Sequence, residues 1–272
     1  MAEKLSRRKS NKVFVVGKDV ALSKNNCENI EYVQLDLTEQ SDEFKQLADS
    51  ADVAVIMTQP NERIIDNLIS TIKSTNRLKK IVYLSSALIY DNFEDKQNET
   101  FSPNPMTDYE RGKLTEEQKL EKFTDDAGFN LCVARLSNVY GDVKNRGLIN
   151  FVFLSLLNDE ELTINGKGDS VRDYIFVEDV VDYIDFLIFW DQKREKETFN
   201  ICTGKGYSVI DVVQTVEKIA GKEIKNKFSP AVPEKGMIIG NNKKIVELSG
   251  MKPKYDLVKG LRQTYKNYLA NK

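Results

Sequence analysis

The sequence predicts an α/β fold built on a doubly wound parallel sheet. Short apolar runs typical of buried strands alternate with stretches whose apolar residues recur at helical spacing. Two of these runs, at residues 80–90 and 130–141, flank a helix that begins near residue 107, which together make a β-α-β unit. Polar residues follow the strands at their carboxyl ends, where ligands bind in folds of this kind.

The other elements follow in chain order from the same patterns. A helical fragment at 1–8 precedes further predicted strands at 13–16, 31–35, 53–57, 162–164 and 173–177. Helices are predicted at 44–47, 64–72, 148–157, 178–190 and 208–220. The last of these begins with a capping box formed by Ser208 and Asp211. Segments 246–250 and 257–269 complete a small mixed α/β lobe at the C-terminal end.

The composition excludes several classes of function. The chain has 272 residues, 40% of them hydrophobic, and a net charge of -2, which gives no electrostatic reason to bind nucleic acid. It contains no histidine, so histidine-based triads and metal sites are excluded, and we expect no metal. Cys27, Cys132 and Cys202 share no metal-binding spacing, and we expect the latter two to be buried. No signal peptide or membrane-spanning run is present, so we expect a cytoplasmic protein.

The pair Tyr109 and Lys113 is the main chemical signal. Residues four apart share one face of a helix, and a nearby ammonium favours the phenolate of a tyrosine. Such a tyrosine can act as a general acid or base. The spacing alone is weak evidence, because it recurs at Tyr140/Lys144, Tyr255/Lys259 and Tyr268/Lys272. Only Tyr109 lies between two predicted strands with polar ends, so that Ser86, Tyr109 and Asn138 are expected to converge on one crevice.

An ordered set of motifs resembles the extended short-chain dehydrogenase/reductase family, the NAD-dependent nucleotide-sugar epimerases and dehydratases typified by UDP-glucose 4-epimerase. The motifs are Asp36-Leu37, Ser85-Ser86-Ala87, Tyr109/Lys113, residues 138–141, residues 171–180 and residues 199–204. The resemblance implies a Rossmann-like fold with residues 1–141 as the dinucleotide-binding core. Residues 142–272 would hold the remaining core elements and the substrate lobe.

The resemblance also implies roles for individual residues. Tyr109 would be the catalytic acid/base, and Lys113 would lower its pKa and bind the cofactor ribose. Ser86 would contact the reacting sugar oxygen. Asp36, followed by Leu37, would contact the adenine of NAD or NADP.

Asn138 and Arg172 would bind the nucleotide-sugar substrate, the arginine at its diphosphate. Each role has a structural alternative. Ser86 can cap a strand end, and Asp36 and Asn138 can form turns. Arg172 can form a salt bridge with Asp173 or Glu178.

The sequence departs from the family at its N-terminal end. The glycine-rich turn that lets the backbone approach a dinucleotide pyrophosphate is missing, since the first glycine is Gly17. Residues 1–19 resemble the end of the family's first helix and its second strand. A missing central strand would leave the sheet to close up or the strand at 13–16 to move into the centre. We therefore expect weak binding of NAD or NADP by this chain.

Two further features bear on function. The family often places a diphosphate-binding arginine near residue 235, where this chain has Lys235, a poor bidentate substitute. The helices at 62–76 and 107–123 correspond to those through which family members often form homodimers.

The leading hypothesis is a nucleotide-sugar epimerase or reductase that moves a hydride at the sugar C4. The alternatives are a cofactor-free binding module of the same fold and a reading frame that starts too late.

Overall fold

The chain forms two compact units, each assembled from three segments. The structure is a computed structural model, and it describes residues 1–8, 11–20, 28–75, 77–91, 95–144, 147–191 and 196–270. The first unit comprises Met1–Ser85, Thr107–Ala134 and Ile184–Thr198. The second comprises Ser86–Met106, Arg135–Tyr183 and Phe199–Lys272. The division thus alternates along the chain, and the assignment of residues 1–141 to a dinucleotide-binding core stays a prediction.

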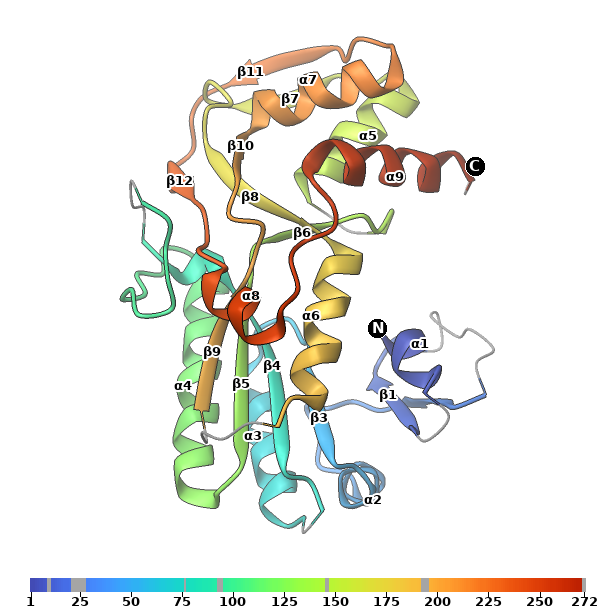
Figure 1. The fold of residues 1–272 in the computed structure, drawn as a ribbon, viewed down its shortest axis with the longest axis vertical. Coiled ribbons are helices and arrows are strands. Elements are labelled where there is room, and N and C mark those ends of the chain that lie inside the picture. Colours follow the sequence, from blue (N-terminus) through green and yellow to red (C-terminus); the bar gives the residue numbers. More distant parts are fainter. Residues whose placement is uncertain are drawn as a thin grey trace. The chain divides into compact units, whose positions relative to one another are not determined.

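The first unit contains two separate sheets (Figure 1). In one, β1 (Val13–Gly17) pairs in parallel with β2 (Ile30–Gln34), and Val15 lies opposite Tyr32. The two strands therefore need a crossover connection between them, as parallel strands do. The other sheet has the order β3-β4-β5-β9, with bounds Val53–Ile56, Lys80–Ser86, Asn130–Leu136 and Lys196–Ile201.

Neither of the two predicted rearrangements of the sheet occurs. Within the described residues β1 pairs with β2 alone and β3 pairs with β4 alone, so the sheet does not close up and β1 does not enter it. The physical reason is that most residues of β1 and β3 are partly accessible to water. Every residue of β1 and three of the four in β3 are only partly buried, so water reaches these strands. A buried backbone group without a partner costs about 1–3 kcal/mol, and a group that water reaches costs less, so these strands can stay unpaired at one edge.

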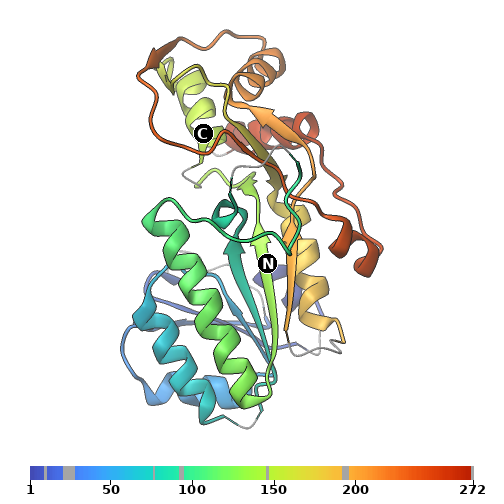
Figure 2. The same ribbon diagram turned by 90° about the vertical axis from the view of Figure 1, so that its left-hand side faces the viewer.

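Helices α3 (Glu62–Lys73) and α4 (Asp108–Ala127) lie side by side along one face of the four-stranded sheet (Figure 2). The apolar stripe of α3 supplies Ile65, Leu68 and Ile72 to a buried core that also contains Tyr83 of β4 and Leu120 of α4. This confirms the structural interpretation of the stripe. The order strand, helix, strand around α4 also confirms the predicted β-α-β unit.

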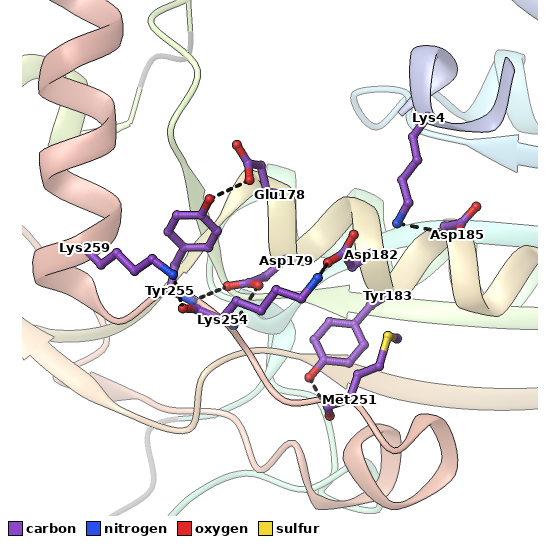
Figure 3. A network of polar contacts seen from close by, with 10 residues as sticks. All are labelled: Lys4, Glu178, Asp179, Asp182, Tyr183, Asp185, Met251, Lys254, Tyr255 and Lys259. Atoms are coloured by element: carbon purple, nitrogen blue, oxygen red, sulfur yellow. Dashed lines mark hydrogen bonds and ion pairs between the residues drawn. The ribbon is translucent and has the colours of Figure 1, made fainter. Parts of the chain in front are cut away.

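The N-terminal residues pack onto the last turns of α6 (Val177–Phe189). The guanidinium of Arg8 lies 2.8 Å from a carboxylate oxygen of Asp185 and 4.0 Å from the centroid of the Phe189 ring. Lys4, in α1 (Ala2–Ser6), pairs with the same carboxylate (Figure 3). Further along, α2 (Asp42–Ser50) begins at Ser41, whose hydroxyl accepts the Phe44 N–H.

The second unit is a mixed lobe around β8 (Val171–Phe176). In it β6 (Asn138–Tyr140) and β12 (Met237–Ile238) pair with β8 in parallel, while β10 (Gly206–Ser208) pairs antiparallel. A second small sheet joins β7 (Leu162–Asn165) and β11 (Asn226–Ser229). The helices are α5 (Leu148–Asn158), α7 (Val209–Ala220), α8 (Lys243–Ser249) and α9 (Leu257–Ala270).

The predicted capping box at the start of α7 is confirmed. The Ser208 hydroxyl accepts the Asp211 N–H, and the Asp211 carboxylate accepts the Ser208 N–H. Cys132 and Cys202 are buried free thiols, also as predicted. No helix in the described parts of the chain is both long and apolar enough to cross a membrane.

Candidate active site

Tyr109 and Lys113 lie on the first turns of α4. The helix begins at the predicted place because the Thr107 hydroxyl accepts the Glu110 N–H at 3.2 Å. The two side chains share a helix face but differ in environment. Tyr109 is 38% exposed, whereas Lys113 is 4% exposed.

The Lys113 ammonium joins α4 to the carboxyl ends of two strands. It donates hydrogen bonds of 2.9 Å to the carbonyl oxygens of Thr58, just beyond β3, and Leu84, in β4. It also lies 4.9 Å from the centroid of the Tyr83 ring. Burial lowers the pKa of Lys113, against the opposing charges of Glu116 and Glu117. The predicted cationic partner of Tyr109 is thus fixed at the edge of the sheet where ligands bind in such folds.

Ser86 is placed in a turn. Its hydroxyl accepts the Leu88 N–H at 3.2 Å and so caps a short 3₁₀ helix, η2 (Ala87–Ile89). This is the strand-end role that the sequence left open. Ser86 belongs to the second unit, as Asn138 does, whereas Tyr109 belongs to the first. Their predicted convergence stays a prediction.

Asp36 also has the turn role that the sequence left open. Its carboxylate accepts the Thr38 N–H and hydroxyl, at 2.9 and 2.6 Å, and lies 2.8 Å from the Lys18 ammonium. The hydrogen bond from Lys18, followed by those from Thr38, lowers the pKa of Asp36 to about 2. The carbonyl of Leu37 accepts a hydrogen bond from Asn67. Asp36 is therefore ionised near neutral pH at the end of β2, and its adenine-binding role stays a prediction.

Arg172 forms a salt bridge, but with a residue that the sequence did not suggest. Its guanidinium lies 3.1 Å from the Glu234 carboxylate and donates to the Val171 carbonyl. The two partners considered from the sequence are engaged elsewhere. Asp173 accepts hydrogen bonds from Thr203 and Gly204, and Glu178 accepts one from the Tyr255 hydroxyl.

Asn138 begins β6, where it lies opposite Tyr174 of β8. It is partly buried, and its substrate-binding role stays a prediction.

Sequence reasoning missed three groups beside Lys113. The hydroxyls of Thr58 and Ser85 are buried and have no hydrogen-bond partner within the described residues. Glu116, fully buried, accepts the Tyr83 hydroxyl at 2.5 Å and the Asn61 N–H at 2.7 Å. Glu116 could have been noticed, because it lies one turn beyond Lys113 on the same face.

In the second unit, Lys235 was considered only as a diphosphate ligand. Its side chain is buried, and its ammonium donates to the Leu88 carbonyl. The described part of the chain holds no cluster of acidic or thiol side chains suited to a metal ion.

Parallel strands covered by helices, with a buried lysine held at the carboxyl ends of two strands, are the features of an α/β fold that binds ligands at that edge. The sequence profile of the NAD dependent epimerase/dehydratase family matches residues 2–202. The chain belongs to this family, as the motifs predicted.

Two relatives illustrate the range of the family. The chain is 32% identical over 232 residues to GDP-6-deoxy-D-talose 4-dehydrogenase of Aggregatibacter actinomycetemcomitans, covering 79% of this chain and 78% of the relative. It is 27% identical over 229 residues to UDP-glucose 4-epimerase of Lacticaseibacillus casei, covering 75% and 68%.

A solved structure confirms the Rossmann-like fold. UDP-glucuronic acid 4-epimerase of Bacillus cereus, in complex with UDP-glucuronic acid and NAD, matches with a TM-score of 0.89. The match covers 100% of this chain and 95% of that chain at 19% identity.

Proposed function

We propose that this chain oxidises and reduces the C4 position of a nucleotide-linked sugar with NAD or NADP, as an epimerase or a reductase. One observation carries the proposal. Lys113 is buried and held by two carbonyl oxygens at the carboxyl edge of β3 and β4, one helical turn from the partly exposed Tyr109. The names of the two relatives, a 4-dehydrogenase and a 4-epimerase, support chemistry at C4.

In this proposal Tyr109 moves the proton and Lys113 supports it. Oxidation of the C4 alcohol removes a hydride from carbon and a proton from oxygen, and reduction returns both. The bound nicotinamide supplies the hydride acceptor. The Tyr109 phenolate takes the hydroxyl proton, and the positive charge of Lys113 stabilises the phenolate. Ser86 provides a further hydroxyl that hydrogen-bonds the reacting oxygen.

The residues present fit the ribose end of a dinucleotide better than its pyrophosphate. The buried hydroxyls of Thr58 and Ser85 have no hydrogen-bond partner within the described residues. Lys113 donates to the carbonyl of Thr58 itself and to that of Leu84, the residue before Ser85. Where the pyrophosphate would lie, β1 ends at Gly17, and the next residue, Lys18, pairs with Asp36. A glycine-rich turn with several backbone N–H donors is not part of this sequence. We therefore propose that the chain binds NAD or NADP weakly.

We further propose that Asn138 and Arg172 bind the nucleotide sugar in the second unit. Arg172 is only 12% exposed and is paired with Glu234, so a diphosphate has to displace this carboxylate or share the arginine with it. Lys235 adds a second positive charge near the same strand, since β12 begins two residues later and pairs with β8.

The reaction can be tested with nucleotide hexoses deuterated at C4 and millimolar NAD⁺. We expect either epimerised sugar that keeps the label at C4, because the hydride returns to the carbon that it left, or C4-oxidised sugar with the label on the nicotinamide. Ser86 is followed by Ala87 and Leu88, which cannot exchange the protons that elimination of water requires. Release of a 4-keto-6-deoxy sugar would therefore contradict the assignment.

A second candidate is a cofactor-free binding module of the same fold. It is favoured by the Arg172–Glu234 pair, which neutralises the expected diphosphate ligand, and by the lack of the glycine-rich turn. This candidate predicts binding of the nucleotide sugar with neither epimerisation nor oxidation at C4.

We also propose a homodimer through the exposed faces of α3 and α4. Support comes from the way both helices cover the same face of the sheet. Light scattering on the purified chain tests the proposal, and a monomer at all concentrations would contradict it.

A further inference from the structure

The segment Met57–Asn61, which we call the strap, connects β3 to α3 and contacts α4. Three of its residues meet the helix face that carries Tyr109 and Lys113. Pro60 packs so closely on Gly112 that a Cβ added there would lie 2.6 Å from the Pro60 Cβ. The Thr58 carbonyl accepts from Lys113, and the Asn61 N–H donates to Glu116.

These contacts follow from helical spacing. A single stripe along α4 is formed by residues that lie three, four and seven positions after Tyr109, namely Gly112, Lys113 and Glu116. The absence of a side chain at Gly112 lets the strap approach the backbone of the helix. The strap therefore lies against the same stripe that holds the proposed catalytic pair.

Glu116 anchors one end of the strap. Its side chain is fully buried, and both carboxylate oxygens accept hydrogen bonds, one from the Tyr83 hydroxyl and one from the Asn61 N–H. Burial, and then the bond to Glu116, raises the pKa of Tyr83, so Tyr83 remains a donor. Asn61 is the N-cap residue of α3, and a carboxylate is favourable at a helix N-terminus.

We propose that Glu116 is a positioning residue for Lys113. By holding Asn61 it fixes the strap, and the strap fixes the Thr58 carbonyl that receives one N–H of the ammonium. The Leu84 carbonyl receives a second. An ammonium has three N–H donors, and the described residues engage two of them, which leaves the third for a ligand. The inference rests on the proposed function, because Lys113 is the residue being positioned.

The experiment measures how fast an amine reagent acylates Lys113, read from the modified peptide by mass spectrometry. Glu116→Ala removes the anchor, and Gly112→Ala pushes Pro60 away without touching the anchor. Loss of one hydrogen bond corresponds to about a tenfold change in the population of the open strap. We expect both variants to raise the rate at Lys113 about tenfold.

Two controls separate positioning from loss of stability. Glu116→Gln keeps an oxygen for the Asn61 N–H and should react at Lys113 as slowly as the wild type. Lys80 is an internal reference in every sample, because it is also buried in the first unit and donates to the Trp190 carbonyl at 2.7 Å. Its rate should not change.

The proposal is overturned if Lys113 and Lys80 accelerate together, if Glu116→Gln behaves like Glu116→Ala, or if Lys113 stays protected in every variant. The reaction needs neither cofactor nor turnover. A negative result therefore removes the role of Glu116 and leaves the assignment of Tyr109 standing, whereas failure of C4 chemistry leaves the protection of Lys113 by the strap measurable but without a catalytic purpose.

Discussion

Two Tyr-x-x-x-Lys pairs, one in each unit, have the same spacing and different environments. Lys113 is buried, and both of its carbonyl partners lie at strand ends. Lys259 is exposed, 4.3 Å from the centroid of the Tyr255 ring, and donates to the Lys254 carbonyl (Figure 3). The two lysines thus differ in burial and in the elements that they join.

The tyrosines differ as well. Tyr109 is partly exposed on α4, whereas Tyr255 precedes α9 and its hydroxyl donates to the Glu178 carboxylate at 2.7 Å. This hydrogen bond raises the pKa of Tyr255 to about 12. A tyrosine with that pKa holds its proton at neutral pH, so the spacing alone does not identify an acid or base.

The surroundings of Tyr255 show what its pair does instead. The Asp179 carboxylate accepts the N–H groups of Lys254 and Tyr255, and the Lys254 ammonium pairs with Asp182 (Figure 3). These contacts attach the segment before α9 to the first turns of α6. The two pairs therefore differ in what their surroundings allow: Tyr255 is bound to a carboxylate, whereas Lys113 is buried at two strand ends, where we propose the catalytic pair.

The largest expected effect separates the two tyrosines. Tyr109→Phe should lower turnover of a nucleotide sugar by roughly 10²–10⁴-fold, because only the proton-carrying hydroxyl is removed. Tyr255→Phe should leave turnover unchanged, since its hydroxyl holds a surface segment. Rates at saturating substrate and millimolar NAD⁺ provide the test. Equal losses in the two variants would refute the distinction.

A smaller effect separates the two lysines by stability. Lys113→Met removes two hydrogen bonds from a charged donor to the carbonyls of Thr58 and Leu84, and we expect a loss of about 1–3 kcal/mol in the free energy of unfolding. Lys259→Met removes an exposed ring contact and should cost less than about 1 kcal/mol. Urea unfolding of both variants measures the difference. A larger loss at Lys259 would reverse the interpretation.

The smallest effect concerns pH. The pKa of Tyr255 is raised above its unfolded value near 10, so the stability from its bond to Glu178 is present below that value. It should be lost as the pH rises toward 12. Tyrosine ¹³Cζ NMR should show a resonance that titrates near pH 12 and disappears in Tyr255→Phe. Titration of that resonance near pH 10 would show that the hydrogen bond is absent in solution.

The sequence predicted the parts of the molecule that depend on local pattern. The start of α4 at Thr107 and the capping box at Ser208 and Asp211 were predicted because each depends on residues within one turn.

Contacts between distant residues were not predictable in the same way. Arg172 pairs with Glu234, 62 positions away, and not with the neighbours Asp173 or Glu178. The partners of Lys113, at Thr58 and Leu84, are backbone carbonyls, which every residue has and no sequence pattern marks. That β1 and β3 stay in separate sheets also could not be predicted. It goes with the partial burial of their residues, which the composition does not reveal.

The most direct test of Lys113 as the cofactor-side lysine is saturation-transfer difference NMR with NAD⁺. It detects weak binding, which we expect of a chain without the glycine-rich turn. At millimolar NAD⁺ the nicotinamide-ribose protons should show transfer in the wild type and in Lys259→Met, and lose it in Lys113→Met. Equal transfer in the two variants would contradict the role of Lys113. Tight stoichiometric NAD⁺ in a calorimetric titration of the same sample would contradict the prediction of weak binding.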